Sequence, residues 1–260
     1  MRLFDAHNHL QDDRFTDEQN SHLIDCENIG LVRMVVNGTS ESDWESVTHL
    51  AKQHPCVLPS FGLHPWFVPQ RSPEWFQTLE NHLAAWSSAV GEIGLDRWKP
   101  GLPYDGQEEV FLAQLRLATD RSLPVTIHCL KAWGRIYDLF RENPLPKRGF
   151  LLHSYGGSTE MVQPLAKLGA YFSFPGYFAH HRKGRQRDAF RQVPLDRLLI
   201  ETDAPDQPLP EERISHPLGK ALNHPANIGA VYEAAAEALG QAPETLCAQV
   251  EKNFQRLFSG

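Results

Sequence analysis

Short apolar runs alternate with longer amphipathic stretches along nearly the whole chain. Eight of these runs, several rich in β-branched residues, predict strands near 2–6, 31–36, 56–61, 88–92, 124–128, 149–153, 170–174 and 197–202. The amphipathic stretches predict helices near 16–28, 41–53, 73–86, 106–121, 132–142, 158–168, 183–192 and 225–239. Eight such alternations are typical of a (β/α)8 TIM barrel, an α/β fold whose active sites lie at the carboxyl ends of the strands. A further helix near 243–257 is expected as an appended packing element.

The composition is that of an ordinary soluble protein. Of the 260 residues, 41% are hydrophobic and 22% are charged, and no apolar run reaches the roughly 18 residues that a membrane span requires. We therefore expect one domain over residues 1–260, with no membrane segment and no secretory signal. The four cysteines are scattered, which favours free thiols in a reducing, cytoplasmic compartment. The net charge of −7 argues against nonspecific coating of nucleic acid.

Side chains that can bind a metal recur where the predicted strands end. Two histidines in L-F-D-A-H-N-H-L have the two-residue spacing that places both on one face of a strand. The complete set of candidate ligands is His7, His9, Glu92, His128, His153 and Asp203. Any one of them alone could be an ordinary hydrogen-bonded residue, but their recurrence at so many strand ends is improbable by chance. Since the set mixes oxygen and nitrogen donors, it predicts a dinuclear metal hydrolase.

Such a centre can hydrolyse phosphodiesters. Two cations about 3.5–4 Å apart can activate water and stabilise both the attacking and the leaving oxygen. Glu92 can bridge the cations because its carboxylate has two oxygens. Asp203 is the candidate base that deprotonates the water, although it could instead cap the loop beside Pro205. His64 also follows a strand, and we assign it to the substrate phosphate or the leaving group, with a structural histidine as the alternative.

Two predicted loops could contact a polynucleotide. Trp66 and Phe67 could stack a nucleobase or pack against the barrel rim. The basic run H-H-R-K-G-R-Q-R at 180–187 could steer a phosphate backbone, although a solvated helix start is the commoner meaning of such a run. Glu201 shares a strand face with Asp203 and should lie deeper, either hydrogen-bonded to a ligand or within a core ion pair. The histidines interpreted as surface residues of helices are His22, His49, His54 and His82.

A series of motifs extends along nearly the whole chain: D-A-H-N-H-L, F-G-L-H-P, V-G-E-I-G-L-D, L-P-V-T-I-H, L-L-H-S-Y-G-G-S, I-E-T-D-A-P-D-Q-P and G-K-A-L-N-H-P. Together they resemble the TatD family of metal-dependent hydrolases. The resemblance implies a TIM barrel of the amidohydrolase superfamily and a phosphodiesterase, usually a deoxyribonuclease, with two divalent cations. It also implies a division of the ligands, with one cation bound by His7, His9 and Asp203, the other by His128 and His153, and Glu92 bridging.

We therefore predict a metal-dependent deoxyribonuclease that acts as a 3′–5′ exonuclease on single strands or ends of DNA, with no obligate protein partner. The two divalent cations could be Mg, Zn or Mn. The main alternative is an amide or ester hydrolase of the same superfamily, such as a lactonase or a D-aminoacyl deacylase. Many of those barrels carry a carbamylated lysine where this chain has Glu92. A non-enzymatic metal-binding protein is the third possibility, and the complete ligand set argues against it.

Overall fold

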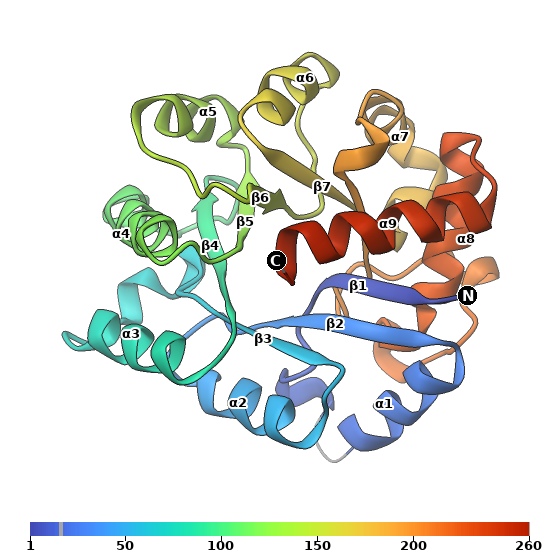
Figure 1. Cartoon of the computed structure of the whole chain (residues 1–260), viewed down its shortest axis with the longest axis horizontal. Helices are drawn as coiled ribbons and strands as arrows, with labels where there is room; N and C mark the ends of the chain where they lie inside the picture. Colours follow the sequence, from blue (N-terminus) through green and yellow to red (C-terminus); the bar gives the residue numbers. More distant parts are fainter. Residues whose placement is uncertain (16–17, 260) are drawn as a thin grey trace.

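Within residues 1–15 and 18–259, which the computed structural model describes, eight parallel strands form one sheet in the order β1 to β8, surrounded by helices (Figure 1). The strands are β1 (Leu3–Asn8), β2 (Leu31–Asn37), β3 (Val57–Phe61), β4 (Ala89–Asp96), β5 (Val125–Leu130), β6 (Phe150–Leu152), β7 (Ala170–Pro175) and β8 (Leu198–Glu201). The longer helices are α1 (Gln19–Asn28), α2 (Trp44–Gln53), α3 (Trp75–Ala85), α4 (Gln107–Asp120), α5 (Trp133–Glu142), α6 (Thr159–Lys167), α7 (Gly184–Phe190), α8 (Ile228–Leu239) and α9 (Pro243–Phe258). The predicted TIM barrel is confirmed, while positions 16 and 17 of the first predicted helix lie outside the described residues.

Hydrogen bonds join the segment directly after the last strand to the first strand and so close the barrel at its carboxyl end. The backbone N–H of Asp203 donates to the carbonyl oxygen of His7 (3.0 Å). The buried carboxylate of Asp5 in β1 reinforces this seam, because it accepts hydrogen bonds from the N–H (3.0 Å) and the hydroxyl (2.6 Å) of Thr202. The seam therefore fixes the end of β1 beside Asp203. No helix among the described residues is long and apolar enough to cross a membrane.

Two strands extend further than the sequence predicts. β4 continues to Asp96 and β5 to Leu130, so Glu92 and His128 lie within their strands. The prediction that these two side chains end their strands is therefore wrong. Gly94 explains the extension, because a Cβ at this position would lie 1.9 Å from the carbonyl oxygen of His128. Only glycine lets β4 approach β5 this closely, and the two strands can then remain paired beyond Glu92.

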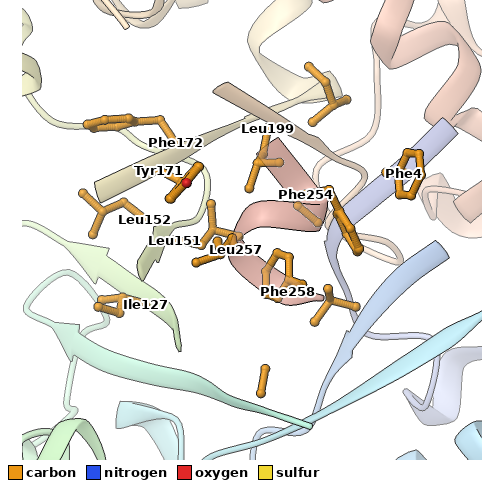
Figure 2. Close-up of a cluster of buried hydrophobic side chains, with 14 of the residues drawn as sticks. Phe4, Ile127, Leu151, Leu152, Tyr171, Phe172, Leu199, Phe254, Leu257 and Phe258 are labelled. Carbon is orange, nitrogen blue, oxygen red and sulfur yellow. The ribbon is translucent and has the colours of Figure 1, made fainter. Parts of the chain in front are cut away.

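Helix α9 packs across the amino-terminal end of the barrel, as expected for the appended helix (Figure 1). The ring of Phe254 lies 5.0 Å, centroid to centroid, from that of Phe4 in β1. The side-chain amide of Asn253 donates to the carbonyl oxygen of Leu198 at the start of β8 (2.7 Å). Figure 2 shows Leu257 among the apolar side chains of the strands. The polar candidate ligands lie at the opposite, carboxyl end of the barrel, which α9 does not cover.

Replacing Leu257 with alanine should lower the free energy of unfolding by about 2–5 kcal/mol, because a fully buried side chain would leave a cavity between α9 and the barrel. Lys252→Ala, on the exposed side of the same helix, should change it by less than about 0.5 kcal/mol. Urea unfolding followed by circular dichroism measures both values. Equal effects of the two substitutions would show that α9 is not part of the packed core.

Candidate metal centre

The end of β1 and the residue that follows it, His9, supply two imidazoles to the carboxyl end of the barrel. The Nε2 atoms of His7 and His9 lie 3.1 Å apart. The Nδ1 atom of His9 donates to the carbonyl oxygen of Asn37 in β2 (2.8 Å), so the lone pair of its neutral ring is on Nε2. In tetrahedral coordination, two nitrogen ligands of one zinc ion lie about 3.3 Å apart. The two histidines therefore have the spacing that a shared cation requires.

Glu92 lies in the middle of the cluster and is only 3% exposed. Its Oε1 is 2.9 Å from Nδ1 of His128 and 2.8 Å from Nε2 of His153. Its Oε2 is 3.2 Å from Nε2 of His9 and 3.5 Å from Nε2 of His7. The carboxylate thus contacts two pairs of histidines through different oxygens. This arrangement suits a ligand that bridges two cations.

Asp96, at the end of β4, orients His128. Its Oδ2 lies 3.1 Å from Nε2 of His128, so in the neutral ring this nitrogen carries the proton and Nδ1 directs its lone pair toward Glu92. The same oxygen accepts a hydrogen bond from the indole Nε1 of Trp66 (2.7 Å). Sequence reasoning assigned no role to Asp96. The available signal was the final aspartate of V-G-E-I-G-L-D, four residues after Glu92.

Asp203 follows β8 in a left-handed backbone conformation (φ 54°). Its Oδ1 lies 3.3 Å from Nε2 of His7 and 3.6 Å from Nε2 of His9. Its Oδ2 accepts a hydrogen bond from the side-chain amide of Gln207. The structure therefore brings Asp203 to the same side of Glu92 as the first pair of histidines.

His64 lies three residues beyond β3 and is buried. Its Nδ1 accepts a hydrogen bond from the backbone N–H of Trp66 (3.2 Å), so the proton of the neutral ring is on Nε2. That Nε2 lies 3.5 Å from Oε1 of Glu92. A protonated ring nitrogen can donate a hydrogen bond but cannot bind a cation. His64 therefore differs from the histidines that direct a lone pair into the centre.

The histidines balance the negative charge of the centre. Burial alone would raise the pKa of Glu92, but the charges of His153 and the neighbouring imidazoles hold this pKa well below its usual value. Burial is likewise outweighed at Asp203, where the hydrogen bond and charge of His7 lower the pKa to about 2. Burial lowers the pKa of His9, but the hydrogen bond and charge of Glu92 and the charge of Asp203 raise it to about 9. Cations that bind here must therefore displace protons from imidazoles.

The loop after β3 is tightly packed. Trp66 is half-buried, its indole N–H is bound to Asp96, and the ammonium of Lys99 lies 3.7 Å from the centre of its ring. Lys99 therefore covers one face of the indole that could have stacked a base. Phe67 packs in a small apolar cluster with Leu63, which favours the rim-packing interpretation of this residue.

The basic run at 180–187 lies in the loop after β7 and in the first turn of α7. Arg187 donates to the carbonyl oxygen of Phe178 (2.7 Å) and so holds the loop together. Arg182 and Arg185 are exposed. Because this loop leaves the carboxyl end of a barrel strand, it is on the same side of the barrel as the candidate metal centre.

Glu201 is fully buried beneath the centre. It accepts hydrogen bonds from the N–H and the hydroxyl of Ser154 (2.8 and 2.5 Å) and from the hydroxyl of Ser173. Its Oε1 lies 3.8 Å from Nδ1 of His153. Glu201 therefore lies within ion-pair distance of a candidate ligand, but 3.8 Å is too long for the hydrogen bond to a ligand that the sequence suggested.

His22 is buried, so its assignment to the surface is wrong. The loop after β8 covers α1, and the ring of His22 lies 4.3 Å, centroid to centroid, from that of His224. Together with Asp25 these histidines could hold a cation. However, Nδ1 of His224 accepts a hydrogen bond from the N–H of Ala226 (2.9 Å), so Nε2 of the neutral ring carries the proton. This protonated Nε2 faces Asp25 at 3.5 Å and offers no lone pair to a cation.

Of the other histidines assigned to the surface, His49 is exposed, whereas His54 and His82 are partly buried.

Comparison with known proteins agrees with the fold and with the motifs. The family model of TatD related DNase matches residues 4–259. The 3′-5′ ssDNA/RNA exonuclease TatD of Citrobacter koseri is 29% identical over 264 residues, covering 98% of each chain. An uncharacterized metal-dependent hydrolase of Haemophilus influenzae is 32% identical over 219 residues, covering 80% of this chain and 83% of the relative. The crystal structure of YjjV, a TatD homolog from Escherichia coli K12, has a TM-score of 0.91 at 26% identity, covering 100% of this chain and 98% of that one. The predicted resemblance is thus confirmed, and the use of a divalent metal is supported.

When divalent cations are removed with a chelator, protonated His9 should stabilise the fold. Its folded pKa of about 9 exceeds the ~6.5 of an unfolded histidine, so the stabilisation is complete below pH ~6.5 and is lost as the pH rises through about 9. At ~1.4 kcal/mol per pKa unit, the loss is about 3 kcal/mol. Unfolding midpoints of the wild type and His9→Gln in EDTA should therefore converge between about pH 6.5 and 10. A difference that stays constant with pH would contradict this assignment.

Proposed function

Because the chain belongs to the TatD-related DNase family and is a metal-dependent hydrolase, we propose that it shortens single-stranded nucleic acid, principally DNA, from the 3′ end. The proposal extends to this chain the activity for which its relatives are named. We further propose that residues 1–260 form one catalytic domain that acts in the cytoplasm. The four free cysteines support that compartment.

The observation that carries the proposal is the position of Glu92 between two pairs of histidines. We propose that two divalent cations bind here, one held by His7, His9 and Asp203, the other by His128 and His153, with Glu92 as the bridge. When bound, the cations polarise the phosphoryl oxygen and supply a hydroxide nucleophile near neutral pH. The imidazole nitrogens suit zinc, and the carboxylate oxygens also admit manganese or magnesium.

Asp203 has the position and charge of a general base. Its lowered pKa keeps the carboxylate ionised, and it lies at the edge of the histidine cluster with one oxygen held by Gln207. The carboxylate can therefore orient a water molecule and accept its proton. His64 takes the complementary role, because the N–H at its Nε2 can donate to a phosphate oxygen beside Glu92.

An amide or ester hydrolase remains the alternative, and nothing specific in the centre favours it. A carboxylate, Glu92, occupies the position where many such enzymes carry a carbamylated lysine. The exposed Arg182 and Arg185, on the side of the barrel where the centre lies, instead fit a substrate with several phosphates. Since the chain has a net charge of −7, a local basic loop is the feature that can attract a polyanion to this face.

Asp203→Asn retains the size of the side chain but removes its charge and basicity. We expect kcat on a 5′-labelled single-stranded oligonucleotide to fall about a hundredfold or more, because the general base is lost. The circular dichroism spectrum should remain that of a folded barrel, although loss of the charge beside His7 should lower the thermal unfolding midpoint. Asp120→Asn, at the exposed end of α4, removes the same charge and serves as the control. Wild-type turnover of Asp203→Asn at saturating metal would assign the base to another group.

Removing the two exposed arginines should weaken the binding of a polynucleotide. Arg182→Ala with Arg185→Ala should raise KM for an oligonucleotide. The slope of log KM against log salt concentration should become shallower by about 0.7 for each lost phosphate contact. Hydrolysis of a small chromogenic phosphodiester should be nearly unaffected. Arg116→Ala with Lys252→Ala removes two exposed charges from α4 and α9 and is the matched control. Equal effects on both substrates, or none on either, would remove the support for a polynucleotide path along this loop.

A further inference from the structure

Two exposed aromatic side chains stand in the loop that follows β4. Trp98 is 54% exposed and Tyr104 is 48% exposed. The loop begins directly after Asp96, the carboxylate that contacts His128 in the candidate metal centre. It therefore leaves the barrel at the mouth of the centre. A large apolar ring that remains in water at this place is available to a ligand.

Hydrogen bonds hold this loop in a defined conformation. Oδ1 of Asp96 accepts from the backbone N–H groups of Trp98 (2.7 Å) and Lys99 (3.0 Å). At the other end of the loop, the hydroxyl of Tyr104 donates to the carbonyl oxygen of Arg97 (2.9 Å). The backbone on both sides of Trp98 is therefore fixed before any substrate binds. An aromatic side chain on a fixed loop loses little conformational entropy when a ligand covers it.

The surroundings of Trp98 fit a single-stranded nucleic acid. Arg97 and Lys99 flank it along the chain: the exposed guanidinium of Arg97 lies 3.2 Å from a carboxylate oxygen of Glu108, and the ammonium of Lys99 lies over the ring of Trp66. Aromatic side chains combined with positive charges are the usual means of binding unpaired bases and their phosphates. Trp66 suits this task less well, because Lys99 covers one face of its ring and Asp96 binds its N–H.

We propose that Trp98 stacks a nucleobase of the bound strand, while Arg97 and Lys99 contact the neighbouring phosphates. The inference rests on the proposed function, since it names the part of the substrate that the centre itself does not touch. Stacking on an indole tolerates any base, so this subsite gives affinity and register with little sequence preference. We therefore assign to Trp98, in the next loop of the barrel, the base-stacking role that the sequence suggested for Trp66.

The test measures KM of the metal-loaded enzyme for a series of oligonucleotides. Each carries one abasic residue, moved stepwise inward from the 3′ end. Trp98→Ala should raise KM for the intact strand about 5- to 150-fold, equivalent to ~1–3 kcal/mol. For the strand that is abasic at the stacked position, the substitution should have no further effect. Trp98→Tyr should restore most of the affinity, whereas Trp98→Leu, which is apolar but not planar, should not.

Ile24→Ala is the control, since Ile24 is an exposed apolar residue on α1 (58% exposed). It should leave KM for every oligonucleotide unchanged. The inference is overturned if Trp98→Ala leaves KM unchanged, or raises it equally for all abasic positions. If the enzyme cleaves a small phosphodiester but no oligonucleotide, the proposed function itself fails. The two failures are thus distinguishable.

Discussion

The buried carboxylate of Glu92 is the contact on which the rest of the centre depends. An ionised carboxylate away from water costs several kcal/mol unless opposite charges surround it. Imidazoles at the end of β1 and just after it, in β5 and in the segment after β6 approach its two oxygens at 2.8–3.5 Å. The closed barrel of parallel strands brings these segments together from positions far apart in the sequence. The fold and the centre are therefore specified by the same strand register.

The periodicity of the sequence predicts the strands and helices of this barrel because each is encoded by its own residues. The side chains that the structure brings together around Glu92 could be identified for a related reason, since each ends or follows an apolar run. The strand boundaries at Glu92 and His128 could not be predicted in this way. They depend on Gly94, whose missing Cβ permits a close approach to a strand more than thirty residues away.

Burial of polar residues was predicted less well, because it depends on segments that are distant in sequence. The assignment of His22 to the surface rests on its polarity and its place on a helix, but it shares the buried face of α1 with Cys26, and the loop after β8 brings His224 against it. Asp96 is a similar case. Its carboxylate is the last residue of a strand, and nothing near it in the sequence indicates that it contacts the rings of Trp66 and His128. Such contacts require the three-dimensional register of neighbouring strands.

Asp96 also connects the candidate metal centre with the loop that we propose contacts the substrate. One of its oxygens orients His128 and binds Trp66, and the other fixes the backbone of Trp98. A movement of the loop after β4 would therefore be transmitted to the imidazole that faces Glu92, since a single rigid carboxylate contacts both. In this barrel, the carboxylate that orients a candidate metal ligand consequently also holds the loop that carries the proposed nucleobase contact.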